Sequence, residues 1–317
     1  MDNVKINLLW SILRKFGLLA VIVLMIIVMS FVSPVFLTRQ NIINVLRQVS
    51  INGIMAVGLT FVILTGGIDL SVGALVAVTS VITGSLLLSG YSVPVAVIAG
   101  VSVAVAFGLF SGTLISVFGL PPFIATLSTM TIGRGFALVY SVGRPFAISN
   151  KTFIAIGQGS SFDIPNPIWI LLVVCVLAYI LLNFTVYGRH IYAFGGNRQA
   201  ARLAGVRTKL VEISVFVISG FLAGVAAIIL SARIRSGQPT AGDGYELDAI
   251  AATAIGGTSM IGGKGSVLGT VMGFVIIGVM SNSLTLLNVS SFYQQIVKGV
   301  IIIIAVMMDS QTKRRKG

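Results

Sequence analysis

Nine long apolar runs constrain this chain more than any other feature. Each approaches the ~20 residues that a helix needs to cross a membrane, and they lie at 16–36, 49–66, 70–89, 93–118, 121–141, 167–187, 210–231, 266–287 and 292–308. Charged residues make up only 9% of the 317 residues, against roughly 25% in a soluble domain. The sequence therefore predicts an all-α, polytopic protein in membrane lipid, with residues 1–317 forming a single membrane domain.

The placement of basic residues sets the number of crossings. Lys5, Arg14 and Lys15 precede the first run, Lys313 to Lys316 follow the last, and the connector 188–209 carries five basic residues and no acid. Such residues collect on the cytoplasmic side, so both termini and the connector are expected there. Two cytoplasmic ends need an even number of crossings, which makes the weaker, glycine-rich segment 248–262 a tenth span, either broken or re-entrant. We expect about ten transmembrane segments.

The same topology places the segments 142–166 and 232–247 outside the cell. The second of them and the residue that follows it mix charges of both signs, at Arg233, Arg235, Asp243, Glu246 and Asp248. These residues can pair with one another or face an external partner. We therefore take all five as candidate external contacts.

The stretch Leu64-Thr-Gly-Gly-Ile-Asp-Leu-Ser-Val-Gly-Ala-Leu75 places a carboxylate and three glycines between two apolar runs. Irregular backbone at membrane depth is tolerated only inside protein or beside water, so the adjacent glycines predict an unwound junction within the bundle. Asp69 has two interpretations that the residues leave open. It caps the helix that begins at Leu70, because Asp is a favoured N-cap, or it lies on a transport pathway. A short echo at 262–269 raises the alternative of an inverted internal repeat, although the match is too brief to establish one.

Motifs for catalysis are incomplete. The stretch Gly257 to Lys264 resembles a phosphate loop, but Gly265 replaces the Ser or Thr that would hold magnesium and no strand precedes it. His190 is the single histidine and Cys175 the single cysteine, so hydrolytic, redox and metal sites lack their parts. We expect no enzyme activity, no metal and no cofactor. The net charge of +13 is explained by cytoplasmic loops and not by nucleic acid.

Few ionisable residues fall within or beside the predicted spans. Arg134 interrupts the run 121–141, Lys298 lies within the run 292–308, and Lys264 lies just before the run that begins at 266. A charge at the centre of a span costs roughly 2.5–3.5 kcal/mol on the insertion scale. Arg134 is therefore expected to pair with an acid or with backbone carbonyls inside the bundle.

The connector carries its own helical signal. Gly195-Gly-Asn-Arg-Gln-Ala-Ala-Arg-Leu-Ala-Gly-Val206 is rich in residues that favour helix and ends in a glycine. Glycine is the commonest residue just past a helix end, so a short helix that ends at Gly205 is expected. It is either part of an ordinary positively charged loop or a docking helix for a cytoplasmic partner.

Five stretches are distinctive when read together: Met55 to Leu75, Pro122-Phe-Ile-Ala-Thr-Leu127, Gly188-Arg-His-Ile-Tyr-Ala-Phe-Gly-Gly-Asn197, Gln238 to Ala251, and Ser291-Phe-Tyr-Gln-Gln-Ile-Val-Lys298. In order and spacing they resemble the permeases of ATP-binding cassette (ABC) importers for ribose and related monosaccharides. The resemblance implies a multi-pass protein of the bacterial cytoplasmic (inner) membrane. A homodimer of such permeases would join cytoplasmic ABC ATPases, which hold the ATP, and would receive the sugar from an extracytoplasmic sugar-binding protein.

The resemblance also assigns a role to the connector. Importers of this superfamily couple through a Glu-Ala-Ala-x-x-x-Gly loop, and Gln199 stands here in place of the acid. The residues implied in ATPase docking are Gly195, Gly196, Asn197, Gln199, Ala200, Ala201, Arg202 and Gly205. The substituted acid implies that the polar contacts of this loop differ from the general importer pattern.

A neutral sugar needs side chains that match its hydroxyl groups. The pathway candidates of that kind are Thr65, Asp69, Ser71, Asn282, Gln294 and Gln295. Ribose is the first expected substrate, with xylose, galactose or a cyclic signalling furanose as alternatives. An ion-coupled secondary carrier is the rival mechanism, although such carriers usually need a relay of intramembrane carboxylates. A membrane enzyme or receptor is the remaining rival.

Overall fold

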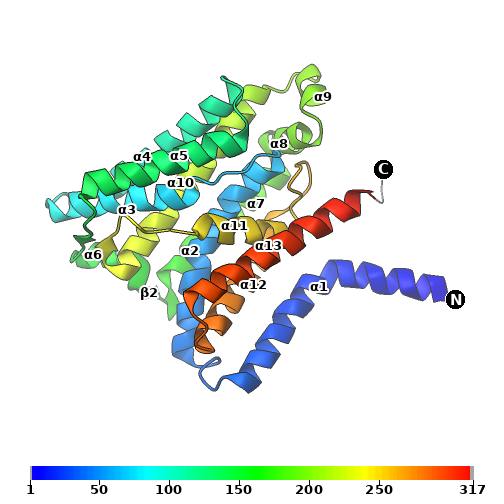
Figure 1. Cartoon of the computed structure of the whole chain (residues 1–317), viewed down its shortest axis with the longest axis horizontal. Coiled ribbons are helices and arrows are strands. Elements are labelled where there is room, and N and C mark those ends of the chain that lie inside the picture. Colours follow the sequence, from blue (N-terminus) through cyan, green and yellow to red (C-terminus); the bar gives the residue numbers. More distant parts are fainter. Residues whose placement is uncertain (1, 315–317) are drawn as a thin grey trace.

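The computed structural model describes the backbone of residues 2–314 and the side chains of residues 17–303 and 307. Helices dominate this range (Figure 1). They are α1 (Asp2–Val32), α2 (Arg39–Leu64), α3 (Val72–Leu88), α4 (Val93–Ser116), α5 (Pro122–Ser141), α6 (Lys151–Gln158), α7 (Asn166–Phe184), α8 (Val186–Gly196), α9 (Arg198–Leu203), α10 (Thr208–Ile234), α11 (Tyr245–Ile255), α12 (Val267–Leu286) and α13 (Ser291–Arg314). The short strands β1 (Phe146–Ala147) and β4 (Ser236–Gly237) pair antiparallel, as do β2 (Ser160–Ser161) and β3 (Ile164–Pro165).

Every apolar run of the sequence forms a helix. Six helices are long and apolar enough to cross a membrane, namely α2, α4, α5, α7, α10 and α12. Shorter apolar helical stretches occur at Gly17–Val32 in α1, in α3 and at Ser291–Ile303 in α13. The prediction of an all-α, polytopic membrane protein is therefore confirmed.

The weak segment 248–262 contains a helix of only half the usual length. The 11 residues of α11 extend about 16 Å at 1.5 Å per residue, whereas the hydrocarbon layer is about 30 Å thick. The glycine-rich residues 256–266 that follow α11 are turns and irregular backbone. This segment is thus a broken one, as its glycines predicted.

Helices α2 and α10 form the centre of the bundle. Every residue of α2 from Val49 to Leu64 is buried, so this helix is surrounded by protein on all sides. Small residues let the neighbours approach closely. On α4, the stripe Ala96, Gly100, Ala104, Gly108 and Gly112 is buried, and a Cβ on Gly112 would lie 2.9 Å from the Cα of Ile213 in α10.

The contacts of α2 to α5 recur among α10 to α13. Helix α2 packs against α11 and α12, and α10 packs against α3 and α4 in the same way. The pairs α3–α4 and α3–α5 likewise match α11–α12 and α11–α13. Helix α2 begins at the end of the molecule that carries the strands and α10 at the end that carries α9 (Figure 1). These matched contacts support the inverted repeat.

The sequence echo at 262–269 does not mark that repeat. The residues 66–71 join α2 to α3, and their counterparts are the residues 235–244 that join α10 to α11. The echo instead joins α11 to α12 and lies directly against the first stretch, where the Gly263 N–H donates to the Leu64 carbonyl at 2.8 Å. Both stretches are rich in glycine because two irregular backbones meet there.

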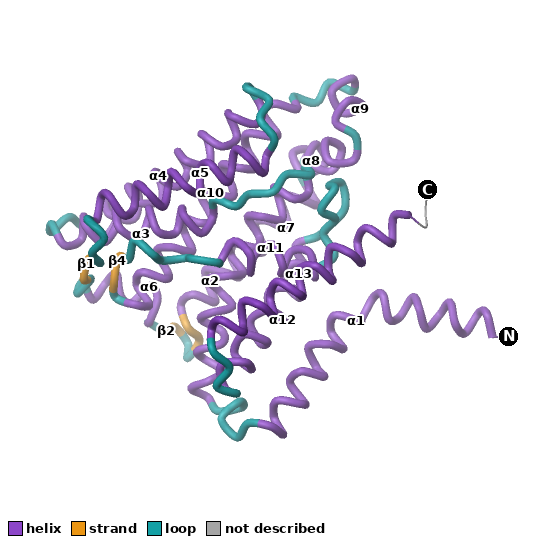
Figure 2. The backbone as a smooth tube through the Cα atoms, viewed as in Figure 1, coloured by secondary structure: helices purple, strands orange, loops and turns teal. Residues whose placement is uncertain are grey.

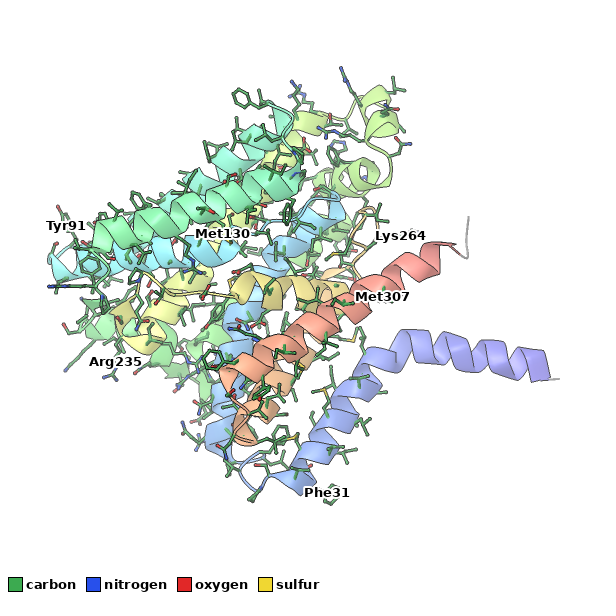
Figure 3. The ribbon with its side chains drawn as sticks, in the orientation of Figure 1. Phe31, Tyr91, Met130, Arg235, Lys264 and Met307 are labelled. Atoms are coloured by element: carbon green, nitrogen blue, oxygen red, sulfur yellow. The ribbon has the colours of Figure 1, made fainter. Side chains whose placement is uncertain are left out.

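The two ends of the bundle differ in their connections (Figure 2). Helices α8 and α9, the start of α1 and the end of α13 lie at one end, while β1, β4 and α6 lie at the other. Arg235 and Lys264 mark these opposite ends in Figure 3. The basic side chains Lys5, Arg14, Lys15 and Lys313 to Lys316 fall outside the described side chains.

Several predicted boundaries were wrong by one to three turns. Helix α2 begins at Arg39 and not at residue 49, because the Thr38 side chain caps it and accepts a hydrogen bond from the Asn41 N–H at 3.4 Å. Helix α1 ends at Val32, short of the predicted 36. The run 167–187 is interrupted at Thr185, whose extended backbone ends α7 and whose side chain accepts from the Gly188 N–H at the start of α8.

Candidate functional site

The junction between α2 and α3 is held by a buried carboxylate. A Schellman motif ends α2, with the Gly66 N–H on the Ile63 carbonyl, the Gly67 N–H on the Val62 carbonyl, and Gly66 at φ +78°. Asp69 then has no exposed surface. Its Oδ1 accepts from the backbone N–H and the hydroxyl of Ser71 at 2.9 and 2.6 Å, and its Oδ2 accepts from the Ser219 hydroxyl of α10 at 2.7 Å.

This geometry corrects the expectation that Asp69 is the N-cap of the next helix. The capping position of α3 is Ser71, because α3 begins at Val72. Asp69 lies two residues earlier, where its carboxylate satisfies the Ser71 N–H and cross-links the junction to α10. Both Asp69 and Ser71 are fully buried within one copy of the chain.

The remaining pathway candidates lie in separate places. Thr65 donates to the Val62 carbonyl at the end of α2. Asn282 of α12 exchanges amide hydrogen bonds of 2.8 and 3.1 Å with Asn41 of α2, and Gln294 donates to the Val289 carbonyl at 3.0 Å. Gln295 is exposed. The structure therefore brings Thr65, Asp69 and Ser71 into one region, but not together with Asn282, Gln294 and Gln295.

Charged residues meet halfway along the bundle, around the start of α11. Lys298 of α13 forms an ion pair with Asp248 at 2.7 Å, and the Asp248 side chain is only 5% exposed. Asn52 of α2 donates to the same carboxylate at 3.4 Å. On the other side of α11, the Nη1 of Arg134 donates to the Ala241 carbonyl at 2.7 Å and its Nη2 lies 3.7 Å from Asp243. Arg134 thus pairs with a carbonyl and an acid, as its position in a span predicted.

These contacts correct the expected course of the segment 232–247. Arg233 and Arg235 lie beside β4 at the strand-bearing end. Asp243 and Asp248 instead lie level with the middle of α5 and of α2, since they contact Arg134 and Asn52 respectively, and Glu246 lies between them in sequence, against Gly73 of α3. The chain enters the bundle after β4 because the glycines at 242 and 244 adopt positive φ and let the backbone turn into α11.

At the strand-bearing end, three arginines surround one glutamine. The carbonyl of Gln158 accepts from Arg47 at 2.6 Å, and its side-chain oxygen accepts from Arg235 at 2.8 Å. Its amide nitrogen donates to the Arg233 carbonyl at 2.7 Å. Sequence reasoning missed Arg47 and Gln158. Arg47 is a basic residue ahead of a buried helix, which was a usable signal, whereas nothing in the sequence distinguishes Gln158.

The connector forms two short helices at the opposite end. Asn197 caps α9, accepting from the Ala200 N–H at 3.0 Å, and Gly205 ends it in a Schellman motif at φ +85°. The expected helix is therefore present, with Ala201 buried and Gln199, Ala200 and Arg202 exposed. Leu203 at its end is 89% exposed.

The connector is tied to the glycine-rich junctions. The Tyr192 hydroxyl donates to the Gly265 carbonyl at 3.0 Å, and burial raises the pKa of this hydroxyl above its ordinary value. Gly195 lies against the Leu64 carbonyl and the Gly263 N–H. Arg198 forms an ion pair with Glu212 of α10 at 2.6 Å. A cavity of about 630 Å³ opens here, lined by Thr65, Gly67, Gly195, Asn197, Arg198 and Glu212 among others.

Within the described side chains, no three His, Cys, Asp or Glu residues come close enough to hold a metal ion. The chemistry available is therefore hydrogen bonding and ion pairing at three places. These are the arginine cluster at one end, the charged residues around α11 halfway along, and the cavity beside α9 at the other end.

Comparison with known proteins identifies the class. The chain is 45% identical over 301 residues to the ribose import permease protein of Bacillus subtilis, with 94% of each chain covered. It is 45% identical over 306 residues to the ribose import permease protein of Escherichia coli K12, covering 95% of each chain. The L-arabinose transport system permease protein of Escherichia coli K12 is 37% identical over 302 residues, covering 95% of this chain and 92% of that one.

No solved structure matches the chain. Residues 41–306 match the family described as the permease component of the branched-chain amino acid transport system. This match spans the bundle from the start of α2 to α13 and includes the junctions, the connector and the charged residues around α11. The chain is a multi-pass membrane protein and belongs to this family of transport permeases.

Proposed function

We propose that this chain is the membrane-spanning subunit of an ATP-driven importer that passes ribose from an external binding protein into the cytoplasm. The observation that carries the proposal is the 45% identity to ribose import permeases over nearly the whole of both chains. The arabinose permeases match less closely, at 37%. A permease component is not itself the catalytic subunit, so ATP binding and hydrolysis are assigned to a separate ATPase and no cofactor to this chain.

The proposed topology has ten crossings in one membrane domain, residues 1–317, of the bacterial cytoplasmic membrane. The start of α1, the end of α13 and the basic connector lie at one end of the bundle, which supports a common cytoplasmic side. The turn residues 239–244 together with α11 supply the tenth crossing. The β1–β4 end then faces outward.

Two copies of the chain form the proposed transport unit. Outside its buried stripe, α5 carries large apolar side chains that no other part of this copy covers, among them Phe123 at 54%, Ile132 at 51% and Val139 at 80% exposure. Arg134 and Asp243 lie along the same helix, and charge at this depth is incompatible with lipid. A second copy that packs on α5 and leaves a polar pathway between the two subunits accounts for both observations.

The two soluble partners are assigned to opposite ends. The ATPase is assigned to α9, where Leu203 and the exposed residues Gln199, Ala200 and Arg202 face away from the bundle. The sugar-binding protein is assigned to the cluster of Arg47, Arg233 and Arg235, which forms no ion pair with an acid among the described side chains. Acidic residues on the binding protein would complement it.

The burial of individual side chains shortens the set of candidate pathway residues. Asp69 and Ser71 are buried and bonded to each other, which supports a structural role at the junction. Gln295 is exposed near the start of α13 and stays a pathway candidate, together with Thr65, Asn282 and Gln294. An ion-coupled carrier finds no support among the relatives.

The test of this proposal is sugar uptake in cells that lack their own ribose transporter. The chain is expressed with the ATPase and binding protein encoded beside it, and uptake of ribose, arabinose, xylose and galactose is compared. We expect ribose to be taken up fastest. Uptake of another of these sugars with no uptake of ribose would support the importer function but would contradict ribose as the substrate.

A further inference from the structure

The acid Asp243 is exposed at a depth where lipid would exclude it. Its partner Arg134 lies in the middle third of α5, about 18 Å from the helix start at 1.5 Å per residue. Figure 3 shows Met130, one turn before Arg134, in the central part of α5 and away from both ends of the bundle. The Asp243 side chain is 87% exposed there. Ionised side chains inside membrane proteins line water-filled routes or pair with each other.

The backbone holds this acid firmly in place. Arg134 donates to the Ala241 carbonyl at 2.7 Å, two residues before Asp243. Gly242 at φ +70° packs closely on α3, where a Cβ would lie 2.7 Å from the Gly73 carbonyl oxygen. Asp243 is thus an exposed side chain on a fixed backbone, with only a loose 3.7 Å approach to the Arg134 guanidinium.

A second carboxylate lies next to it on the first turn of α11. Glu246 is half-buried, and its Oε2 lies against Gly73, in the first turn of α3. This oxygen is buried and has no hydrogen-bond partner among the described residues. The N-terminal turn of α3 favours a negative charge at this position. The Glu246 Oε2 is therefore a hydrogen-bond acceptor that is fixed in position and has no donor among the described residues.

The acid on the other side of α11 differs from these two because a cation lies against it. Asp248 is 5% exposed, its Oδ2 accepts a hydrogen bond from Lys298 at 2.9 Å, and its Oδ1 lies 2.7 Å from the same ammonium group without hydrogen-bond geometry. That carboxylate is paired with a cation and is closed to solvent. Asp243 and Glu246 have acceptor capacity left over, and the Arg134 guanidinium beside them is a donor.

We propose that Asp243 and Glu246, positioned by Arg134, bind sugar hydroxyl groups halfway through the membrane. This inference rests on the proposed function and names a contact site within its pathway. Hydroxyl groups of a neutral monosaccharide donate to carboxylates and accept from a guanidinium. Charge-assisted hydrogen bonds of this kind are about twice as strong as neutral ones, and a site of both signs needs no ion to accompany the sugar.

The experiment uses the complete importer in vesicles: this chain, its ATPase and its binding protein loaded with radiolabelled ribose. Uptake and ATP hydrolysis are measured in parallel for wild type, Asp243→Asn and Glu246→Gln. The matched control is Asp163→Asn, because Asp163 is also an exposed acid in an ion pair with an arginine, Arg39, at 3.2 Å. Asp163 lies in the β2–β3 turn, away from α5 and α11.

We expect Asp243→Asn to lower the sugar transported per ATP hydrolysed by about tenfold, the effect of weakening one charged hydrogen bond. Glu246→Gln should lower the same ratio, and Asp163→Asn should leave it within about twofold of wild type. A purely structural role would reduce uptake and hydrolysis together.

Three results would overturn the inference. One is an unchanged ratio in both pathway variants, and another is an equal fall of uptake and hydrolysis. The third is dissociation of the two permease copies in either variant, measured by size-exclusion chromatography with light scattering, since it would assign these charges to contacts between subunits. Failure of the wild-type importer to move ribose at all would instead overturn the proposed function.

Discussion

Asp69 is the residue whose role the structure changes most. It lies between two apolar runs, yet no part of it is exposed. Two donors from Ser71, the cap of α3, and one from Ser219 of α10 satisfy its two oxygens. A carboxylate that is enclosed in this way stabilises the turn between α2 and α3 and fixes it to the centre of the bundle.

We expect Asp69→Ala to lower the free energy of unfolding by about 1–3 kcal/mol, because the Ser71 N–H and the Ser219 hydroxyl lose their acceptor in a buried place. Asp69→Asn should be much milder, since the amide oxygen can still accept from Ser71 while its NH₂ group donates to Ser219. Melting temperatures in detergent measure both. An Asn variant as unstable as the Ala variant would show that the charge itself is required.

Glycine positions in the connector differ in what surrounds them. A Cβ at Gly195 would collide with the Leu64 carbonyl and the Gly263 N–H, whereas a Cβ at Gly196 would meet nothing within 4 Å. Gly195→Ala is therefore expected to separate α8 from the end of α2 and to lower both the yield of folded protein and uptake. The adjacent Gly196→Ala is the control and should behave as wild type. Equal yield and equal uptake in the two variants would contradict the close contact of Gly195 with the end of α2.

At the scale of elements, α9 is a short helix that contributes little to the core. Its caps, Asn197 and Gly205, were predictable from the sequence, because capping depends on local residue types. Its exposed Leu203 was not predictable, because exposure depends on how the helix lies on the bundle.

Leu203→Ser tests the docking role of α9. Removal of a central apolar contact at an interface typically costs 1–3 kcal/mol, so we expect the affinity for the ATPase to fall about tenfold or more, measured by co-purification and by titration with the purified ATPase. Phe162→Ser is the control, since Phe162 is 91% exposed at the opposite end. An unchanged affinity of the Leu203 variant would remove α9 from the interface.

At the scale of the whole molecule, hydropathy predicted the all-α, polytopic architecture, because the six long membrane-spanning helices of the described range are apolar over most of their length. The position of the short helix α11 was harder to predict, because it depends on the turn residues 239–244 before it and on burial of Asp248 against Lys298. The path of Asp243 and Glu246 into the bundle was missed for the same reason. Contacts such as that of Arg134 with Ala241 join residues far apart in the chain. The hydrophobic periodicity of the sequence does not predict contacts of this kind.

The internal repeat also belongs to this scale. Sequence similarity suggested it at 262–269, but the matching contacts of α2 to α5 and α10 to α13 are what support it. The two halves differ where chemistry matters. The α2–α3 junction is closed by Asp69, whereas the α10–α11 junction leaves Asp243 exposed. One half thus supplies rigidity and the other a polar surface.

The most direct test of an ATP-driven sugar permease is ribose uptake into vesicles that contain the purified chain, with and without its ATPase. We predict accumulation of ribose only when the ATPase, ATP and the sugar-loaded binding protein are all present, and none when a proton or sodium gradient is supplied alone. Gradient-driven accumulation by the chain without the ATPase would contradict this account.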